Sequence, residues 1–146
     1  MRIDDAHGNT LNTRECSIHD DFLEKVDFNF EKREIVLSIE RNYSINGNCA
    51  TGRYTITFMN VVDFHITTCD FCEKASRIWE FYYVPHEERT FLPRLLQKKE
   101  SYYASCYCNL NSAASFMEVV MKFTSLDEII VVCEFVDFEY VIDSAI

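Results

Sequence analysis

The stretch Lys25-Val26-Asp27-Phe28-Asn29-Phe30, followed by Glu34-Ile35-Val36-Leu37-Ser38-Ile39-Glu40, decides the fold. Apolar residues recur at every second position in both parts. Because successive side chains of a strand point to opposite faces, each part has one apolar face and one mainly polar face. The loop Glu31–Glu34 places Phe30 opposite Ile35, with both on the buried face. The stretch therefore predicts a hairpin, with strands Leu23–Phe30 and Glu34–Arg41, in a one-sided antiparallel sheet.

Similar alternation occurs in four further segments. Two of them flank Asn60, a residue that tolerates a left-handed backbone, so the chain there forms either a tight hairpin or one bulged strand. In the last segment the apolar phase changes near Phe135, which predicts a bulge or bend. The inward residues of the four segments are Tyr54, Ile56 and Phe58; Val62, Phe64 and Ile66; Met117, Val119, Met121 and Phe123; and Ile129, Val131, Cys133 and Phe135.

The middle of the chain is less regular. Apolar residues from Asp70 to Glu80 lie near helical spacing, the segment 81–84 favours a strand, and Phe91–Lys99 suits a second short helix with Thr90 as its cap. The chain thus predicts an α+β fold, mainly an antiparallel sheet of six to eight strands with one or two short helices. Residues 1–18 are expected to form a loose polar arm, and residues 19–146 a single β-rich domain.

Composition restricts the class of partner. Fourteen basic and 24 acidic residues give a formal net charge of −10. This charge disfavours binding to nucleic acid and favours a basic protein partner. The alternative is that the acidic residues only keep the protein soluble. Apolar runs are too short to span a bilayer and the N-terminus lacks the apolar core of a signal peptide, so we expect no membrane association and a cytoplasmic location. The oligomeric state is left open.

The seven cysteines include two close pairs, a CxxC and a CxC. Four thiolates could bind zinc if the two pairs met in space, which would make the chain a zinc-stabilised structural domain. An odd number of cysteines without an export signal favours reduced thiols instead, with Cys133 acting as a small core residue. The zinc hypothesis concerns Cys69, Cys72, Cys106 and Cys108.

His19 and Asp20 precede the first strand and are the candidates for an enzyme or a small-molecule site. An imidazole beside a carboxylate can act as a general base or bind a metal. The alternative is that either side chain bonds backbone groups where the arm enters the sheet. Nucleophile elbows, phosphate loops and dinucleotide fingerprints are absent, and three glycines could not build them. No catalytic residue is assigned.

Aromatic residues with neighbouring acids form the candidate contact surface. Tyrosine and tryptophan are enriched at protein interfaces, where their polar tips can stay hydrated. Part of the set must also cover the sheet, and Trp79 suits the core better than an interface. The candidate partner-binding residues are Trp79, Glu80, Tyr82, Tyr83, Glu87, Glu88, Tyr102 and Tyr103.

Short boxes in the chain resemble small bacterial proteins of unknown function. The boxes are His19-Asp20-Asp21-Phe22-Leu23, Ile56–Val61 and Glu128–Glu134. The usual form of the first box is HD-S-x-L; here Asp21 replaces the serine, and the tryptophan-glycine common before the middle box is missing. Some such families are grouped with immunity proteins that neutralise polymorphic toxins. The resemblance implies a non-enzymatic module that binds a toxin domain, and it carries no catalytic residue.

Overall fold

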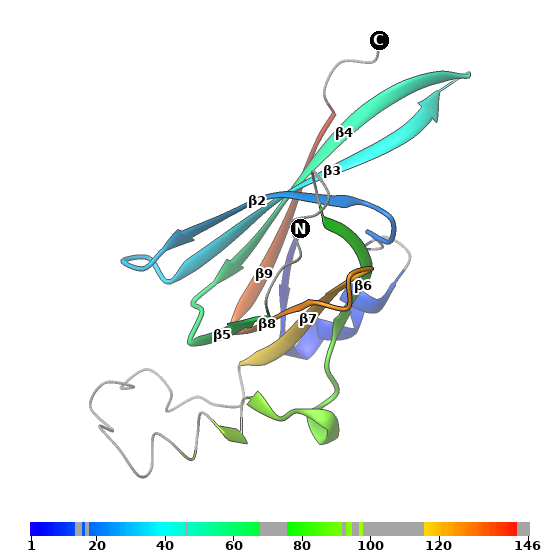
Figure 1. The fold of residues 1–146 in the computed structure, drawn as a ribbon. Helices are drawn as coiled ribbons and strands as arrows, with labels where there is room; N and C mark the ends of the chain where they lie inside the picture. The colour runs from blue at the N-terminus through cyan, green and yellow to red at the C-terminus, as the bar shows by residue number, and fades with distance from the viewer. Residues whose placement is uncertain are drawn as a thin grey trace.

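The protein is an antiparallel sheet of nine strands in the described residues, which in this computed structural model are 1–13, 16, 18–45, 47–67, 76–91, 93–94, 97 and 116–142 (Figure 1). Two short 3₁₀ helices, η1 (Asp5–Asn12) and η3 (His86–Glu88), accompany the sheet. The strands are β1 (Arg2–Asp4), β2 (Phe22–Asn29), β3 (Glu34–Ile45), β4 (Asn48–Met59), β5 (Asp63–Ile66), β6 (Ser76–Tyr83), β7 (Met117–Phe123), β8 (Glu128–Cys133) and β9 (Phe135–Ile142). The predicted class, α+β with mainly antiparallel sheet, is confirmed.

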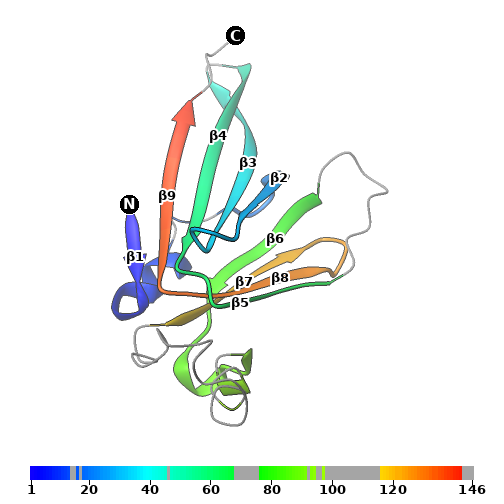
Figure 2. The same cartoon turned by 90° about the vertical axis from the view of Figure 1, so that its left-hand side faces the viewer.

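The sheet closes on itself. Its order is β1-β9-β4-β3-β2-β6-β7-β8-β5, and a single residue, Glu134, separates β8 from β9. The strands from β9 to β8 therefore form a ring of neighbours, as in a small barrel, while β1 and β5 lie outside it. Figure 2 shows β3, β4 and β9 rising from the corner and β5, β7 and β8 running across below them. The ring surrounds one apolar core.

Two neighbouring bends make this corner. β4 passes into β5 at Asn60, whose φ of 52° is left-handed, and β8 passes into β9 at Glu134. The Asn60 side chain donates a hydrogen bond from Nδ2 to Glu134 Oε2, 2.6 Å away. Both sequence expectations, a left-handed Asn60 and a bend near Phe135, are confirmed. Asn60 joins two strands with different partners, β4 with β9 and β5 with β8, so it is not the turn of a hairpin.

The core follows the predicted alternation. On β3 the side chains of Ile35, Leu37 and Ile39 are buried, and Ile56 and Phe58 face them from β4. On β7 and β8 the inward residues are Met117, Val119, Met121, Phe123, Ile129, Val131 and Cys133, all buried. Burial raises the pKa of the Cys133 thiol, as expected for a cysteine that serves as a small apolar core residue.

The N-terminal segment is part of the packed fold, so the prediction of a loose arm is wrong. β1 pairs with β9, and η1 packs against β6 with Gly8 and Leu11 buried. Ile3 and Ile18 also lie in the core. The sequence did not indicate this packing, because the segment is mostly polar and its few apolar residues follow no period. Those few apolar side chains are nevertheless enough to cover one end of the ring. The extra strand β1 also raises the number of strands above the predicted six to eight.

The middle of the chain corrects one predicted helix and agrees with the described part of another. Residues 76–80 of the predicted helix Asp70–Glu80 belong to strand β6, and its residues 70–75 lie outside the described part. The register shifts between Ile78 and Glu80, so in β6 the adjacent apolar residues Ile78 and Trp79 interrupt the alternation that predicts a strand. In the second predicted helix, Phe91, Pro93, Arg94 and Gln97 are helical. In the described ranges no helix is long and apolar enough to cross a bilayer.

Candidate interaction surfaces

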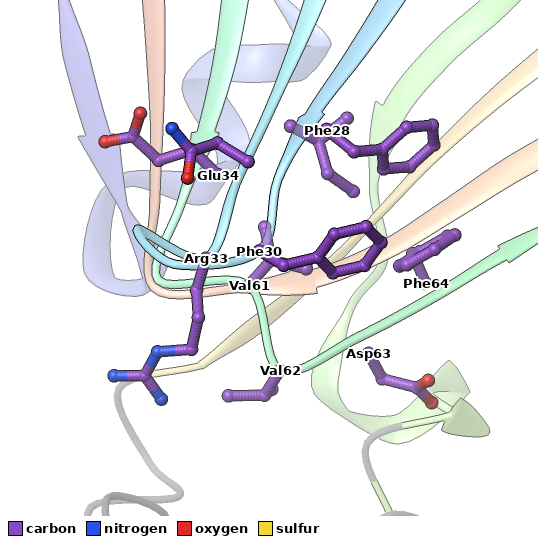
Figure 3. A pocket seen from close by; sticks show the side chains of 10 residues that line it. Phe28, Phe30, Arg33, Glu34, Val61, Val62, Asp63 and Phe64 are labelled. Atoms are coloured by element: carbon purple, nitrogen blue, oxygen red, sulfur yellow. The ribbon is translucent and has the colours of Figure 1, made fainter.

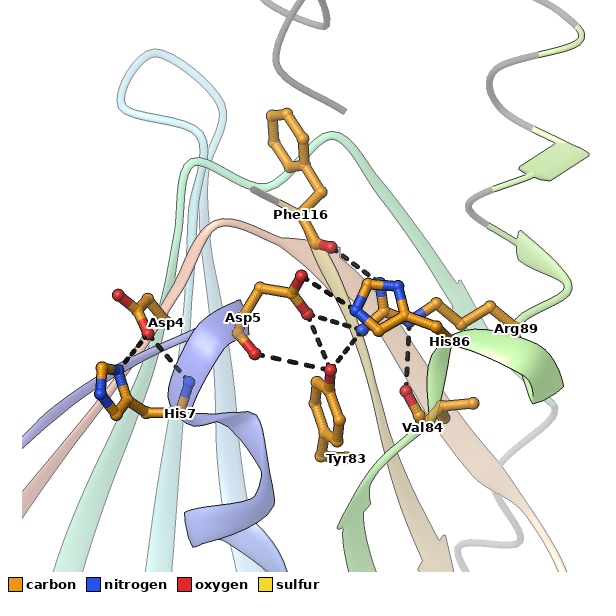
Figure 4. Close-up of polar contacts among 8 residues, drawn as sticks. All are labelled: Asp4, Asp5, His7, Tyr83, Val84, His86, Arg89 and Phe116. Carbon is orange, nitrogen blue, oxygen red and sulfur yellow. Dashed lines mark hydrogen bonds and ion pairs between the residues drawn. The ribbon is translucent and has the colours of Figure 1, made fainter. Parts of the chain in front are cut away.

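The predicted contact residue Tyr83 lies inside the molecule, 5% exposed, in a polar cluster that joins η1, β6 and η3 (Figure 4). Its hydroxyl donates to Asp5 Oδ1 at 2.9 Å and accepts a bond from Arg89 Nη2 at 2.7 Å. Arg89 is itself buried and also donates to Asp5 Oδ1 at 2.6 Å. Tyr83 as a partner-binding residue is therefore a wrong prediction, since these bonds occupy its polar tip.

Arg89 completes the cluster through the backbone. Its Nε donates to the carbonyl oxygen of Val84 and its Nη1 to that of Phe116, at 3.1 and 3.0 Å. Every guanidinium nitrogen thus has an acceptor, as a buried cation requires. His86 Nε2 lies 3.3 Å from Asp5 Oδ2 at the exposed side of the cluster. The arrangement fixes the N-terminal segment to the end of β6.

Trp79 is at the surface, with 52% of its area exposed. The irregularity of β6 between Ile78 and Glu80 places it there: Ile78 still enters the core, and Trp79 occupies the extra position that a bulge creates. The expectation that Trp79 suits the core is therefore wrong. An exposed indole on a strand is a typical anchor for a protein partner.

His19 supports the tryptophan. The two rings contact edge to face with centroids 5.1 Å apart, and His19 Nδ1 lies 2.6 Å from the Trp79 carbonyl oxygen. Because a carbonyl oxygen only accepts, Nδ1 is the donor. Asp20 Oδ2 lies 3.4 Å from the other ring nitrogen, and both side chains are exposed. The predicted alternative role, a bond from His19 to a backbone group where the chain enters the sheet, is what the geometry shows.

A groove of about 480 Å³ runs beside these residues. We define the Trp79 surface as four of the side chains that line it: His19, Trp79, Glu80 and Tyr82. Asn12, Ile18 and Phe81 complete its lining. Three of the predicted partner-binding residues, Trp79, Glu80 and Tyr82, are thus brought together.

The remaining predicted residues fall elsewhere. Glu87 and Glu88 are exposed in η3, and Glu88 lines a second groove of about 260 Å³ together with Tyr82 and Lys122. Lys122 lies over the Tyr82 ring, 5.7 Å from its centroid. Tyr82 therefore links the two grooves. Tyr102 and Tyr103 lie outside the described residues.

The zinc hypothesis stays a prediction. Cys69, Cys72, Cys106 and Cys108 all lie outside the described residues. Within the part of the chain that the structure describes, no group of three or more His, Cys, Asp or Glu side chains is placed to hold a metal ion.

A second exposed aromatic surface was missed from the sequence (Figure 3). Phe28, and not Phe30, pairs with Ile35, so the β2–β3 loop is four residues long but lies one residue earlier than predicted. Phe30 is consequently 79% exposed and stacks on Phe28, with ring centroids 6.1 Å apart. Asn29 is the signal that could have found this loop, since its Oδ1 accepts the Lys32 amide at 3.0 Å and fixes the turn.

The ring of Phe64 on β5 continues this surface. It lies 5.1 Å from Phe28, and a groove of about 230 Å³ separates the hairpin loop from the start of β5. Arg33, Glu34 and Asp63 contribute charges of both signs to the groove. We call Phe28, Phe30, Phe64 and the neighbouring Ile66 the Phe30 surface.

Comparison with known proteins gave no relative for this chain. No family model, no curated protein and no solved structure matches it.

Proposed function

We propose that this chain is a non-catalytic protein-binding module that binds a basic protein through the Trp79 surface. The observation that carries the proposal is the half-exposed indole of Trp79, held by His19 at the edge of a groove. A tryptophan that is already oriented loses little side-chain freedom on binding, so its burial contributes strongly to affinity.

Charge supports the class of partner. Glu80 lines the groove with Trp79, Asp20 Oδ2 lies 3.4 Å from His19 Nε2, and the whole chain has a net charge of −10. Such a field attracts cationic proteins, accelerates their association and repels phosphate backbones. We therefore propose a basic protein, and not a nucleic acid, as the partner, with the cytoplasm as the place of encounter.

The sharpest form of the proposal is an immunity-type protein that blocks a basic toxin domain. It is motivated by the resemblance of the short boxes and by the net charge. A non-enzymatic blocker needs only a tight complementary surface, which agrees with the absence of a catalytic motif from the sequence.

Affinity capture tests the binding surface. Wild type, Trp79→Ala and Phe30→Ala are immobilised and exposed to native lysate at low ionic strength, and bound proteins are identified by mass spectrometry. Phe30→Ala is the control, because Phe30 is a still more exposed aromatic, 79% against 52% for Trp79, and it follows the far end of β2, about 26 Å along the strand from Phe22, which pairs with β6. We expect wild type and the control to retain a basic protein that salt elutes. Removal of the Trp79 anchor should weaken retention about thirtyfold.

Two results would contradict the proposal. One is equal retention by wild type and Trp79→Ala when circular dichroism shows both folded; the other is capture of no protein. The immunity form has its own test: co-expression with the protein encoded by the neighbouring gene. If that protein is toxic alone and remains toxic beside the wild-type chain, the immunity form fails while protein binding can still stand.

A further inference from the structure

The outer edge of β5 is an unpaired strand edge within the described residues. β5 pairs with β8 on one side and ends the strand order of the sheet on the other. An edge of this kind presents free backbone donors and acceptors to any strand of matching shape.

The ladder identifies which backbone groups are free. Thr67 N donates to Glu128 O at 3.1 Å, and Glu128 N donates to Thr67 Oγ1 at 2.8 Å, so the backbone N–H of Thr67 points toward β8. Because bonded and non-bonded pairs alternate in an antiparallel ladder, Asp63 and His65 also bond toward β8. The N–H and C=O groups of Phe64 and Ile66 consequently point away from β8, toward the open edge.

Exposed apolar side chains accompany this edge. Ile66 is 41% exposed and lies on the same face of β5 as Phe64. Beyond Phe64 the strip continues through Phe28, 39% exposed, to Phe30. An apolar strip beside free backbone groups is the combination that strand addition uses.

We infer that the β5 edge is the interface of a symmetric dimer, in which β5 of a second copy adds to it in antiparallel orientation. The order Asp63-Phe64-His65 complements itself about a twofold axis. Within one chain His65 Nε2 lies 3.6 Å from Asp63 Oδ2. With Phe64 opposite Phe64 of the second copy, each Asp63 also faces His65 of the other copy, and this happens twice. Phe64 is then a hydrogen-bonded pair, in agreement with the groups that point outward.

Local charge agrees with a second copy at this place. A net charge of −10 opposes self-association over most of the surface. The hairpin loop beside β5 is balanced, however, since Lys32 and Arg33 offset Glu31 and Glu34. The loop therefore adds no net charge to the repulsion between two copies at the apolar strip.

Sedimentation velocity over a concentration series tests the inference on the full chain. We expect a reversible monomer–dimer equilibrium. Ile66→Pro removes an N–H that faces the open edge and leaves the bonds to β8 in place, so it should abolish the dimer. Ile66→Val is the matched control, because it keeps both the N–H and an apolar side chain, and it should dimerise like wild type.

Charge variants test the register without disturbing the backbone. His65→Asp places carboxylates opposite each other at both ends of the pairing and should raise the dimer dissociation constant about tenfold. The exchange variant Asp63→His with His65→Asp restores the opposition of acid and imidazole and should restore dimerisation. A wild-type chain that stays monomeric at every concentration overturns the inference. The inference is also wrong if folded Ile66→Pro still forms the dimer. It is equally wrong if a different polypeptide is found bound at the outer edge of β5.

Discussion

Gly8 shows how tightly single residues are constrained in the polar cluster. A Cβ atom built there would lie 2.2 Å from two ring carbons of Tyr83, whose hydroxyl is held by Asp5 and Arg89. The ring cannot rotate away without breaking those bonds. Gly8 is therefore required by space, although η1 itself would accept many residues.

Gly8→Ala is expected to destabilise the protein by about 2 to 3 kcal/mol, because overpacking against a fixed ring forces the backbone to shift. Urea unfolding followed by circular dichroism measures the free energy of unfolding. Asn9→Ala, an exposed position in the same helix, is the control and should change it by less than about 0.5 kcal/mol. An equal effect of both variants would show that η1 does not pack on Tyr83 as described.

Buried Asp21 and partly buried Arg41 form a second ion pair, which has a consequence for the pH dependence of stability. Arg41 Nε and Nη2 donate to both carboxylate oxygens of Asp21 at 2.8 to 3.0 Å. Burial raises the pKa of Asp21, and the Arg41 hydrogen bonds and charge oppose that rise. Removal of Arg41 takes away the effect that lowers the pKa of Asp21 and leaves the burial that raises it, so the pKa of Asp21 rises further.

Arg41→Met should consequently destabilise the protein in a pH-dependent way. A carboxyl whose pKa is higher in the folded state stabilises the fold below its ordinary value of 3.8 and loses that contribution as pH rises through the folded value. The loss of unfolding free energy should be small near pH 3 and about 2 to 3 kcal/mol at pH 7, since Arg41 is only partly buried. Arg53→Met, which removes an exposed pair with Glu24, should show an almost constant effect. A pH-independent loss for Arg41→Met would contradict the assignment.

At the scale of elements, the two bends at Asn60 and Glu134 turn long strands into a ring. Both the left-handed backbone of Asn60 and its 2.6 Å bond to Glu134 are needed to hold them together. Substitution separates the two requirements. Glycine accepts the left-handed backbone but lacks the hydrogen bond, whereas alanine disfavours that backbone and also lacks the hydrogen bond.

Asn60→Gly should lose about 1 kcal/mol for the hydrogen bond, and Asn60→Ala should lose about 1 to 2 kcal/mol more for a left-handed backbone with a Cβ. Thermal and urea unfolding of both variants measure the difference. Equal stability of the two variants would mean that the backbone at position 60 is not left-handed in solution.

At the scale of the whole molecule, the first strand of the chain, β1, pairs with its last strand, β9. β1 and η1 cover the end of the ring with Ile3 and Leu11, and Asp5 compensates the buried Arg89. The fold therefore depends on contacts between the two ends of the chain, whose large sequence separation makes them costly in loop-closure entropy.

Deletion of residues 1–12 should abolish cooperative thermal unfolding and expose apolar surface that binds the dye ANS. Asp5→Asn, which keeps the apolar cover and removes one charge, should unfold cooperatively at a lower temperature. An unchanged melting curve for the deletion would restore the original prediction of a loose arm.

The sheet could be predicted from the sequence where each strand has one buried face, as in Ile35, Leu37 and Ile39. The exposure of Phe30 could not be predicted, because a loop displaced by one residue reverses which side chains face outward. The same limit applies to the candidate site. Trp79 is exposed because of a bulge, and Tyr83 is buried because Asp5 and Arg89 reach it from distant segments; local periodicity encodes neither.

The junction between β2 and β6 is the shortest ladder in the ring. Phe22 and Leu23 pair with Arg77 and Ser76, and the ladder continues through bonds of Asp20 and Asp21 with Ile78, whereas β3 and β4 pair from Ile35 to Ile45. The amides of Asp20 and Ile78 should therefore exchange with deuterium faster than those of β3. His19 and Trp79 lie on opposite sides of this junction. A partner that contacts both residues would bridge the junction and make its local opening less frequent. Slower deuterium uptake at Asp20 and Ile78 would then report occupancy of the surface without any knowledge of the partner's identity.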